Sequence, residues 1–317
     1  MATEYLATKV DAEEVSDPLA NLPLLARDYM VTRDKRIRDC WVSHAHLFSY
    51  PTEKLRRIDS AVNPEIRLDD LPVGSFTYSV SFRLERPYIS KGNCAFHLHE
   101  NPLLRDKCFQ LPLIPGSSWK GALRSAFYSA VLARSGKIDA CSRFQARRLF
   151  GGENEQVQEW LDDDEQMKAG ERKKLKELLQ EKAILETNNR GCLSFYPTFF
   201  NRMQVEIINP HRRTQKKGTF PILIDAVKTG SEGCFRLLYV PFDSIDKAQK
   251  DVWARPRQDR AELVRATRFM MERGVGAKTS SGYGAMRILS ERTDPPTPWK
   301  VEGLPNRGSH EAKQDGC

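Results

Sequence analysis

The sequence predicts an α+β domain, because strand-like and helix-like hydrophobic patterns alternate along it. Residues 76–84 alternate large apolar and polar side chains, as in a strand with one buried face. Residues 117–132 and 259–273 place apolar side chains at helical spacing. Further strand-like runs lie at 191–196, 203–208, 234–240 and 285–289. The predicted order is strand, helix, strands, strand, helix, strand, which is the order of a ferredoxin-like fold and of RNA recognition motifs.

Changes in composition divide the chain into three parts. Residues 1–70 form an N-terminal extension that begins acidic and continues with basic stretches. Residues 71–292 form the ferredoxin-like domain. Within it, the charged and glycine-poor residues 153–190 indicate an insertion of one or two surface helices. Residues 293–317 are expected to form a loose C-terminal tail.

The start of the first predicted helix has the features of an anion site. Pro115-Gly116 predicts a turn, and Ser117 or Ser118 is expected to cap the helix that follows. Lys120 and Arg124 lie one turn apart on the same face, beside the free N–H groups of the first turn, which suits a phosphate. The alternative is an ordinary helix start with both cations in water. The expected apolar stripe comprises Ala122, Leu123, Ala126, Phe127, Ala130, Val131 and Leu132.

A second candidate site is a glycine-rich stretch between the last helix and the last strand. It contains Gly274, Gly276, Gly282 and Gly284 around Lys278, together with three hydroxyl side chains. We expect a flexible loop outside the core, which the backbone of a polyanion could approach closely. It is not a Walker loop or a dinucleotide-binding fingerprint, because it lies between a helix and a strand in the reverse order. The alternative is a mobile connection without a ligand.

A basic segment follows the strand-like run at 203–208. We expect a finger that reaches along a nucleic acid backbone, and the alternative is a solvated hairpin tip. Residues 225–230 are predicted to form a turn. The predicted RNA-contacting residues of the finger are His211, Arg212, Arg213, Lys216 and Lys217.

The connection at residues 87–110 is unusually long for a compact domain, which favours a functional role. It contains Lys91, a predicted RNA contact, and the group His97, His99 and Glu100. A carboxylate there could bind a divalent ion such as Mg²⁺ or Mn²⁺, or help to activate a ribose 2′-hydroxyl. A neighbouring histidine could then act as an acid or a base. Glu100 could equally be a turn residue, because Asn101-Pro102 follows it.

Composition limits the classes of function. The 317 residues allow one large domain or two small ones, and the net charge of +8 suggests an anionic partner. Seven cysteines without a Cys-x-x-Cys pair indicate neither a zinc site nor a disulfide framework. Their odd number and the lack of a signal peptide favour the cytoplasm. No apolar run is long enough to span a membrane.

The two glycine-bearing motifs together resemble one family. Pro-Gly-Ser-Ser-x-Lys-Gly-x-x-Arg at 115–124 and Gly-x-Gly-x-Lys-x-Ser-x-Gly-x-Gly at 274–284 are similar to the motifs of the repeat-associated mysterious proteins (RAMPs). Leu149-Phe150-Gly151 and Ile208-Asn209-Pro210-His211 support the resemblance, which covers residues 74–289. It implies a subunit of a CRISPR type III effector complex, of the Cmr or Csm kind. The implied partners are guide RNA, target RNA, other RAMP subunits and the large subunit. No aromatic RNP-type strand is present, so base stacking on the open sheet is not expected.

The resemblance also frames the question of catalysis. Backbone subunits of the family cut target RNA with an aspartate in the loop before the Pro-Gly-Ser-Ser motif, and the matching position here is Glu100. Its longer side chain departs from the family pattern. One hypothesis is therefore a guide-RNA-holding subunit, and the other is an endoribonuclease that cuts target RNA or processes precursor RNA. Processing enzymes use His, Tyr and Lys near the glycine-rich loop, where this chain has Tyr283 and Lys278 but no His. A phosphate-binding metabolic enzyme is a third and more remote possibility.

Overall fold

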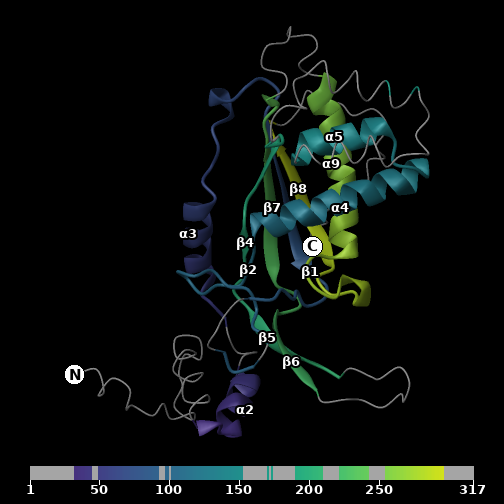
Figure 1. Cartoon of the computed structure of the whole chain (residues 1–317). Coiled ribbons are helices and arrows are strands. Elements are labelled where there is room, and N and C mark those ends of the chain that lie inside the picture. Colours follow the sequence, from purple (N-terminus) through teal and green to yellow (C-terminus); the bar gives the residue numbers. More distant parts are fainter. Residues whose placement is uncertain are drawn as a thin grey trace, which may run out of the picture.

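The computed structural model describes residues 32–44, 49–92, 97–99, 101–152, 170, 173, 190–209, 221–242 and 254–295. Its centre is an antiparallel sheet with helices on both faces (Figure 1). Helices α4, α5 and α9 lie against one face, and α3 lies on the opposite side. None of the helices in these ranges is both long and apolar enough to cross a membrane.

The central strand of the sheet is β1 (Phe76–Leu84), as its alternating pattern predicted. It pairs antiparallel with β7 (Glu232–Tyr239) on one side and with β8 (Met286–Asp294) on the other. The short strand β3 (Leu193–Phe195) extends the sheet beyond β7, which gives the order β3-β7-β1-β8. Alternate side chains of β1 are buried because one face of the strand packs on helices.

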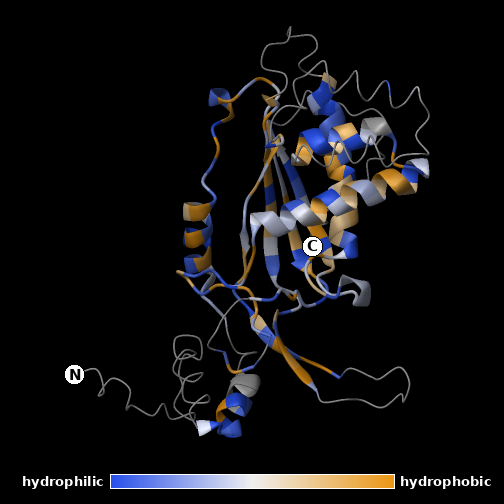
Figure 2. Cartoon of the chain, in the orientation of Figure 1, coloured by the Kyte–Doolittle hydropathy of each residue, from blue (hydrophilic) through white to orange (hydrophobic). Residues whose placement is uncertain are grey.

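Two twenty-residue helices cover the buried face of the sheet. They are α4 (Gly116–Ser135) and α9 (Ala254–Arg273), which occur where helical periodicity predicted them. Figure 2 shows apolar residues along both helices. The buried side chains that they contribute to the core include Trp119, Leu123, Phe127, Val131, Leu263, Ala266 and Met270.

The start of α4 differs from the prediction. The helix begins directly after Pro115, and no side chain caps it, so Ser117 and Ser118 lie inside the first turn instead. The Pro115 carbonyl accepts hydrogen bonds from the backbone N–H groups of Ser118 and Trp119, at 3.0 and 3.1 Å. The prediction of a serine cap is wrong because Pro115, with its extended backbone, already closes the turn. Leu132, expected on the apolar stripe, is 49% exposed.

A two-stranded hairpin projects from one end of the main sheet (Figure 1). It consists of β5 (Met203–Ile208), at the predicted residues, and β6 (Ile222–Val227). The prediction of a turn over residues 225–230 is wrong for its first half, because Asp225 lies in the middle of β6. The turn itself is confined to Thr229 and Gly230.

Shorter elements complete the structure. The strands β2 (Leu113–Ile114) and β4 (Thr198–Phe199) pair with each other, and β2 leads directly into α4. Asp139 caps the helix α5 (Ala140–Phe150), because its side chain accepts a hydrogen bond from the N–H of Ser142. The N-terminal extension contains α2 (Lys35–His44) and α3 (Thr52–Val62).

The described residues include only some of the boundaries predicted between the parts of the chain. Most of the predicted insertion at 153–190 lies outside the described residues. The predicted tail was to begin at residue 293, but β8 continues in the sheet as far as Asp294.

Candidate functional site

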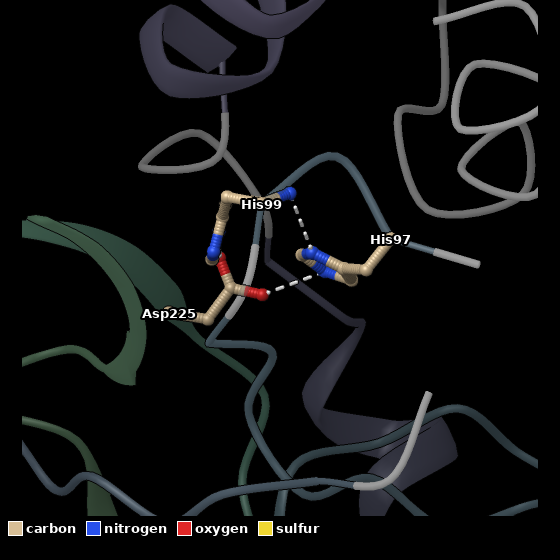
Figure 3. A group of neighbouring side chains, drawn as sticks. All are labelled: His97, His99 and Asp225. Carbon is tan, nitrogen blue, oxygen red and sulfur yellow. Dashed lines mark hydrogen bonds and ion pairs between the residues drawn. The ribbon is translucent and has the colours of Figure 1, made fainter. Parts of the chain in front are cut away.

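Asp225, in the middle of β6, is the centre of a buried cluster. Its Oδ1 lies 2.9 Å from His99 Nε2, and its Oδ2 lies 3.0 Å from both His97 Nε2 and Arg105 Nη2. The Asp225 side chain is fully buried, and those of His97, His99 and Arg105 are 3%, 6% and 7% exposed. Figure 3 shows the two imidazoles converging on the carboxylate.

Backbone hydrogen bonds set the proton positions on both histidines. The Nδ1 of His97 accepts a hydrogen bond from the N–H of His99 at 3.4 Å, and the Nδ1 of His99 accepts one from the N–H of Asn101 at 3.3 Å. A neutral imidazole that accepts at Nδ1 carries its proton at Nε2, so both Nε2–H groups face Asp225. Burial alone would raise the pKa of Asp225, but the interactions with His97 and His99 outweigh it and hold that pKa well below its usual range.

The direction of the hydrogen bonds in this cluster does not favour a metal ion. His97, His99 and Asp225 are the one group of possible metal ligands found within the described ranges. A metal-bound histidine usually donates its second ring N–H to a carbonyl or carboxylate, whereas here the second ring nitrogen faces a backbone donor. Arg105 also occupies the carboxylate with a positive charge. The donors therefore satisfy Asp225 without a metal.

The cluster fastens the long connection of residues 87–110 to the β5–β6 hairpin. The Asp225 N–H donates to the Asn101 carbonyl at 3.1 Å, and the Asn101 side-chain amide donates to the Leu223 carbonyl at 3.2 Å. Glu100 lies outside the described residues, between two neighbours that are held by these contacts. His97 and His99 direct their Nε2 atoms at Asp225 and have little exposed surface, so the arrangement suits a positioning role.

The glycine-rich loop packs closely on the domain, contrary to the expectation of a flexible loop outside the core. Val275 is 2% exposed, and the N–H of Gly284 donates to the Pro87 carbonyl at 2.9 Å. A Cβ atom at Gly274, Gly276 or Gly284 would collide with neighbouring backbone, and all three have positive φ. These glycines are therefore required by the fold itself.

Gly282 and Lys278 form the open side of this loop. Gly282 has φ +85°, and a Cβ atom there would meet no neighbour. Lys278 has φ +59°, is exposed, and precedes the short 3₁₀ turn Thr279–Ser281. The Tyr283 hydroxyl donates to Glu206 Oε2 on β5 at 3.1 Å. The loop thus lies beside the hairpin stem, and its exposed positions can reach a ligand.

The packing of α4 and α9 relates the two glycine-bearing motifs. Arg134 pairs with Glu262 at 2.5 Å, and Arg273 donates to the Ser129 hydroxyl at 3.1 Å, so the helices are antiparallel. The end of α9, where the glycine-rich loop begins, contacts α4 at Ser129, in the C-terminal half of that helix. The predicted phosphate contacts Lys120, which is half-buried, and Arg124, which is exposed, lie in its N-terminal half.

The remaining predicted RNA contacts are Lys91 and the basic finger. Lys91 is exposed and forms a β-bridge with Leu103 at the edge of the long connection. The basic finger, with His211, Arg212, Arg213, Lys216 and Lys217, lies outside the described residues. The strands on either side of it are paired, since Ile208 lies opposite Ile222 at the end of the hairpin stem.

Sequence patterns did not reveal Asp225 and Arg105 as members of the site. Each lies more than a hundred residues from at least one partner, and neither belongs to a motif. The available signal was weak. An acidic residue in a buried strand needs a hydrogen-bond donor, and the two histidines of the His-x-His in the long connection each supply one.

Comparison with known proteins places the chain in one family. The model of the RAMP superfamily matches residues 41–287. The fold is similar to a chain in the cryo-EM structure of the type III-B Cmr-beta complex bound to cognate target RNA. The TM-score is 0.52 and the identity 16%, over 92% of this chain and 87% of that chain. The crystal structure of Cmr6 from Pyrococcus furiosus aligns with a TM-score of 0.35 and 16% identity, over 69% of this chain and 99% of that chain. No curated protein matches the sequence.

Proposed function

The chain belongs to the RAMP superfamily, and from this membership we propose that it is a guide-RNA-binding subunit of a CRISPR type III ribonucleoprotein, which recognises complementary RNA in antiviral defence. The family match over residues 41–287 carries the proposal. The net charge of +8 agrees with an RNA partner. The likeness to a Cmr-beta chain supports the fold, and the sheet order β3-β7-β1-β8 supports a ferredoxin-like core.

In this proposal the RNA backbone is held by loops and a helix end. Lys278 on the glycine-rich loop and Arg124 on α4 are exposed, and α4 packs on α9, the helix that leads into the loop. Lys120 on α4 and Lys91 on the long connection add positive charge, and the loop contacts that connection where the Ala277 N–H donates to the Ile89 carbonyl. The finger at residues 211–217 would clamp phosphates from the end of the hairpin. The other RAMP subunits and the large subunit would be the protein partners.

The endoribonuclease alternative depends on Glu100. The Asp225 cluster holds both of its neighbours, His99 and Asn101, which would fix the backbone on either side of a catalytic carboxylate. His97 and His99 do not favour acid–base roles, because their Nε2 atoms face Asp225. A divalent ion would be required only if Glu100 is catalytic. A metabolic enzyme is less favoured, since the RAMP family accounts for both glycine-bearing motifs.

The test is binding of the full chain to single-stranded RNA, followed by fluorescence anisotropy between 50 and 300 mM salt. Lys278→Ala and Arg124→Ala should each lower the salt dependence by about 0.7 in slope, as expected for one lost phosphate contact on a single strand. Arg67→Ala is the matched control, because it removes an equally charged side chain that is 82% exposed. Failure of the wild-type chain to bind RNA would refute the proposed function.

A further inference from the structure

A groove of about 450 Å³ lies between α3 and the open face of the main sheet. This volume is within the range of roughly 300–1,000 Å³ that is common for ligand pockets. None of its lining residues belongs to a site predicted from the sequence. The residues that the argument uses are Asp59, Asn63, Ser79, Tyr196, Arg236 and Arg292.

The floor of the groove is a row of polar side chains across three strands. Ser79 on β1 pairs with Arg236 on β7 and with Arg292 on β8, so the two arginines flank the serine. Because neighbouring strands are about 4.8 Å apart, the two arginine backbones are about 10 Å apart. Both side chains leave the sheet on the face that α3 covers, opposite to the buried side chains of β1.

The wall of the groove is held rigidly by α3. Asp59 accepts hydrogen bonds from Nη1 and Nη2 of Arg236, at 3.0 and 2.7 Å. It also accepts one from the Asn63 side-chain amide at 2.8 Å, and that amide donates in addition to the Pro197 carbonyl at 3.1 Å. The guanidinium, the carboxylate and the amide therefore form one connected and preorganised network.

Three groups in the groove still lack a partner or offer a free surface. Asn63 Oδ1 is buried and accepts no hydrogen bond from the part of the chain that the structure describes. Arg292 is exposed at the sheet edge and forms no ion pair within the same ranges. Tyr196 is half-buried, follows β3 and lines the groove. A matching ligand has a hydrogen-bond donor, an anionic group and a flat face.

We propose that this groove binds one nucleotide of single-stranded RNA. The phosphate pairs with Arg292, the base lies against the ring of Tyr196, and a base amino or imino group donates to Asn63 Oδ1. Glu65 and Asp294 also line the groove, and their charges disfavour a second phosphate there. Tyr196 follows the strand β3 and is not part of it, so this stacking does not require an aromatic RNP-type strand.

This inference rests on the proposed RNA-binding function, so the variants must separate the two sites. The full chain is titrated with a fluorescein-labelled single-stranded RNA, and anisotropy is measured for Tyr196→Ala, Arg292→Gln and Lys278→Ala. We expect Tyr196→Ala to weaken binding about tenfold, as for the loss of one stacked base. Arg292→Gln should lower the salt slope by about 0.7. Arg57→Gln is the control, because it removes the same charge from α3 at a 79% exposed position outside the groove.

Cross-linking provides a second readout that does not depend on affinity. RNA that contains 4-thiouridine should cross-link to the peptide that carries Tyr196, and Tyr196→Phe should retain the cross-link and the affinity. If Lys278→Ala weakens binding while both groove variants bind like the wild type, the groove proposal is wrong and the proposed function stands. Groove variants that bind RNA normally but lose a protein subunit would also overturn the proposal, in favour of a protein occupant. If the wild-type chain binds no RNA, both proposals fail.

Discussion

Replacing Asp225 by Asn should destabilise the protein strongly, because three donors face one buried carboxylate. The amide has the shape of the carboxylate, but its NH₂ group would point at a donor of His97, His99 or Arg105. Arg105, only 7% exposed, would also keep a charge without its partner. Breaking a buried ion pair in this way costs about 3–5 kcal/mol. That is a large part of the roughly 5–15 kcal/mol that stabilises a typical domain.

Thermal unfolding followed by circular dichroism at neutral pH measures this effect. A loss of 3–5 kcal/mol corresponds to a fall in Tm of roughly 6–20 °C for a domain of 150–250 residues. The control is Glu232→Gln, which breaks an ion pair with Arg83 whose side chains are 44% and 59% exposed. Exposed pairs contribute about 0–1 kcal/mol, so the control should change Tm little. Equal Tm values for the two variants would refute the reasoning.

The Tm difference between the wild type and Asp225→Asn should depend on pH. The pKa of Asp225 is depressed in the folded state, so its stabilisation is fully present above the unfolded pKa of about 3.9. It is lost as the pH falls below that value towards the folded pKa. The Tm difference between wild type and Asp225→Asn should therefore be constant above about pH 5 and narrow below about pH 4. A difference that stays constant down to pH 3 would show that the charge of Asp225 is not what stabilises the fold.

Three further predictions follow from the same structure. Gly284→Ala should unfold the glycine-rich loop and lower Tm, because its Cβ would collide with the Val275 carbonyl. Gly282→Ala should cost only about 1–2 kcal/mol for its positive φ, because a Cβ there lies in open space. Equal changes in Tm for the two variants would contradict this reasoning. Trp119→Phe should cost about 1–3 kcal/mol in denaturant titrations, since its indole N–H donates to Thr198 at 3.1 Å in the core, and an unchanged midpoint would contradict the value of that bond. Incubation with EDTA should leave Tm unchanged, and a clear fall would show that a bound metal stabilises the chain.

Periodicity predicted the main elements correctly where local pattern and burial agree. The strand β1 has the predicted residues 76–84, because its alternation reflects a sheet face packed on α4 and α9. The helix α9 begins five residues before its predicted start at 259, which is more than the one or two residues by which helix ends usually differ. The family resemblance, based on the two glycine-bearing motifs, is confirmed by the match over residues 41–287.

Predictions failed where a distant partner overrides local preference. Asp225 and Gly230 suggested a turn, but the donors of His97, His99 and Arg105 make a buried strand position favourable for the aspartate. Ser117 and Ser118 have the chemistry of helix caps, but α4 begins at Gly116, before either serine, and both lie in its first turn.

The sequence by itself determined the order of the elements, the basic character of the chain and the family, since these depend on spacing and composition. Only the tertiary structure decided what the titratable and glycine residues do. It joined His97, His99 and Arg105 to an aspartate more than a hundred residues away, and it showed that Gly284 fills a position without room for a side chain. It also placed Arg236 and Arg292 in one row beneath α3. Such contacts depend on strand register and packing, which bring together residues that no local pattern connects.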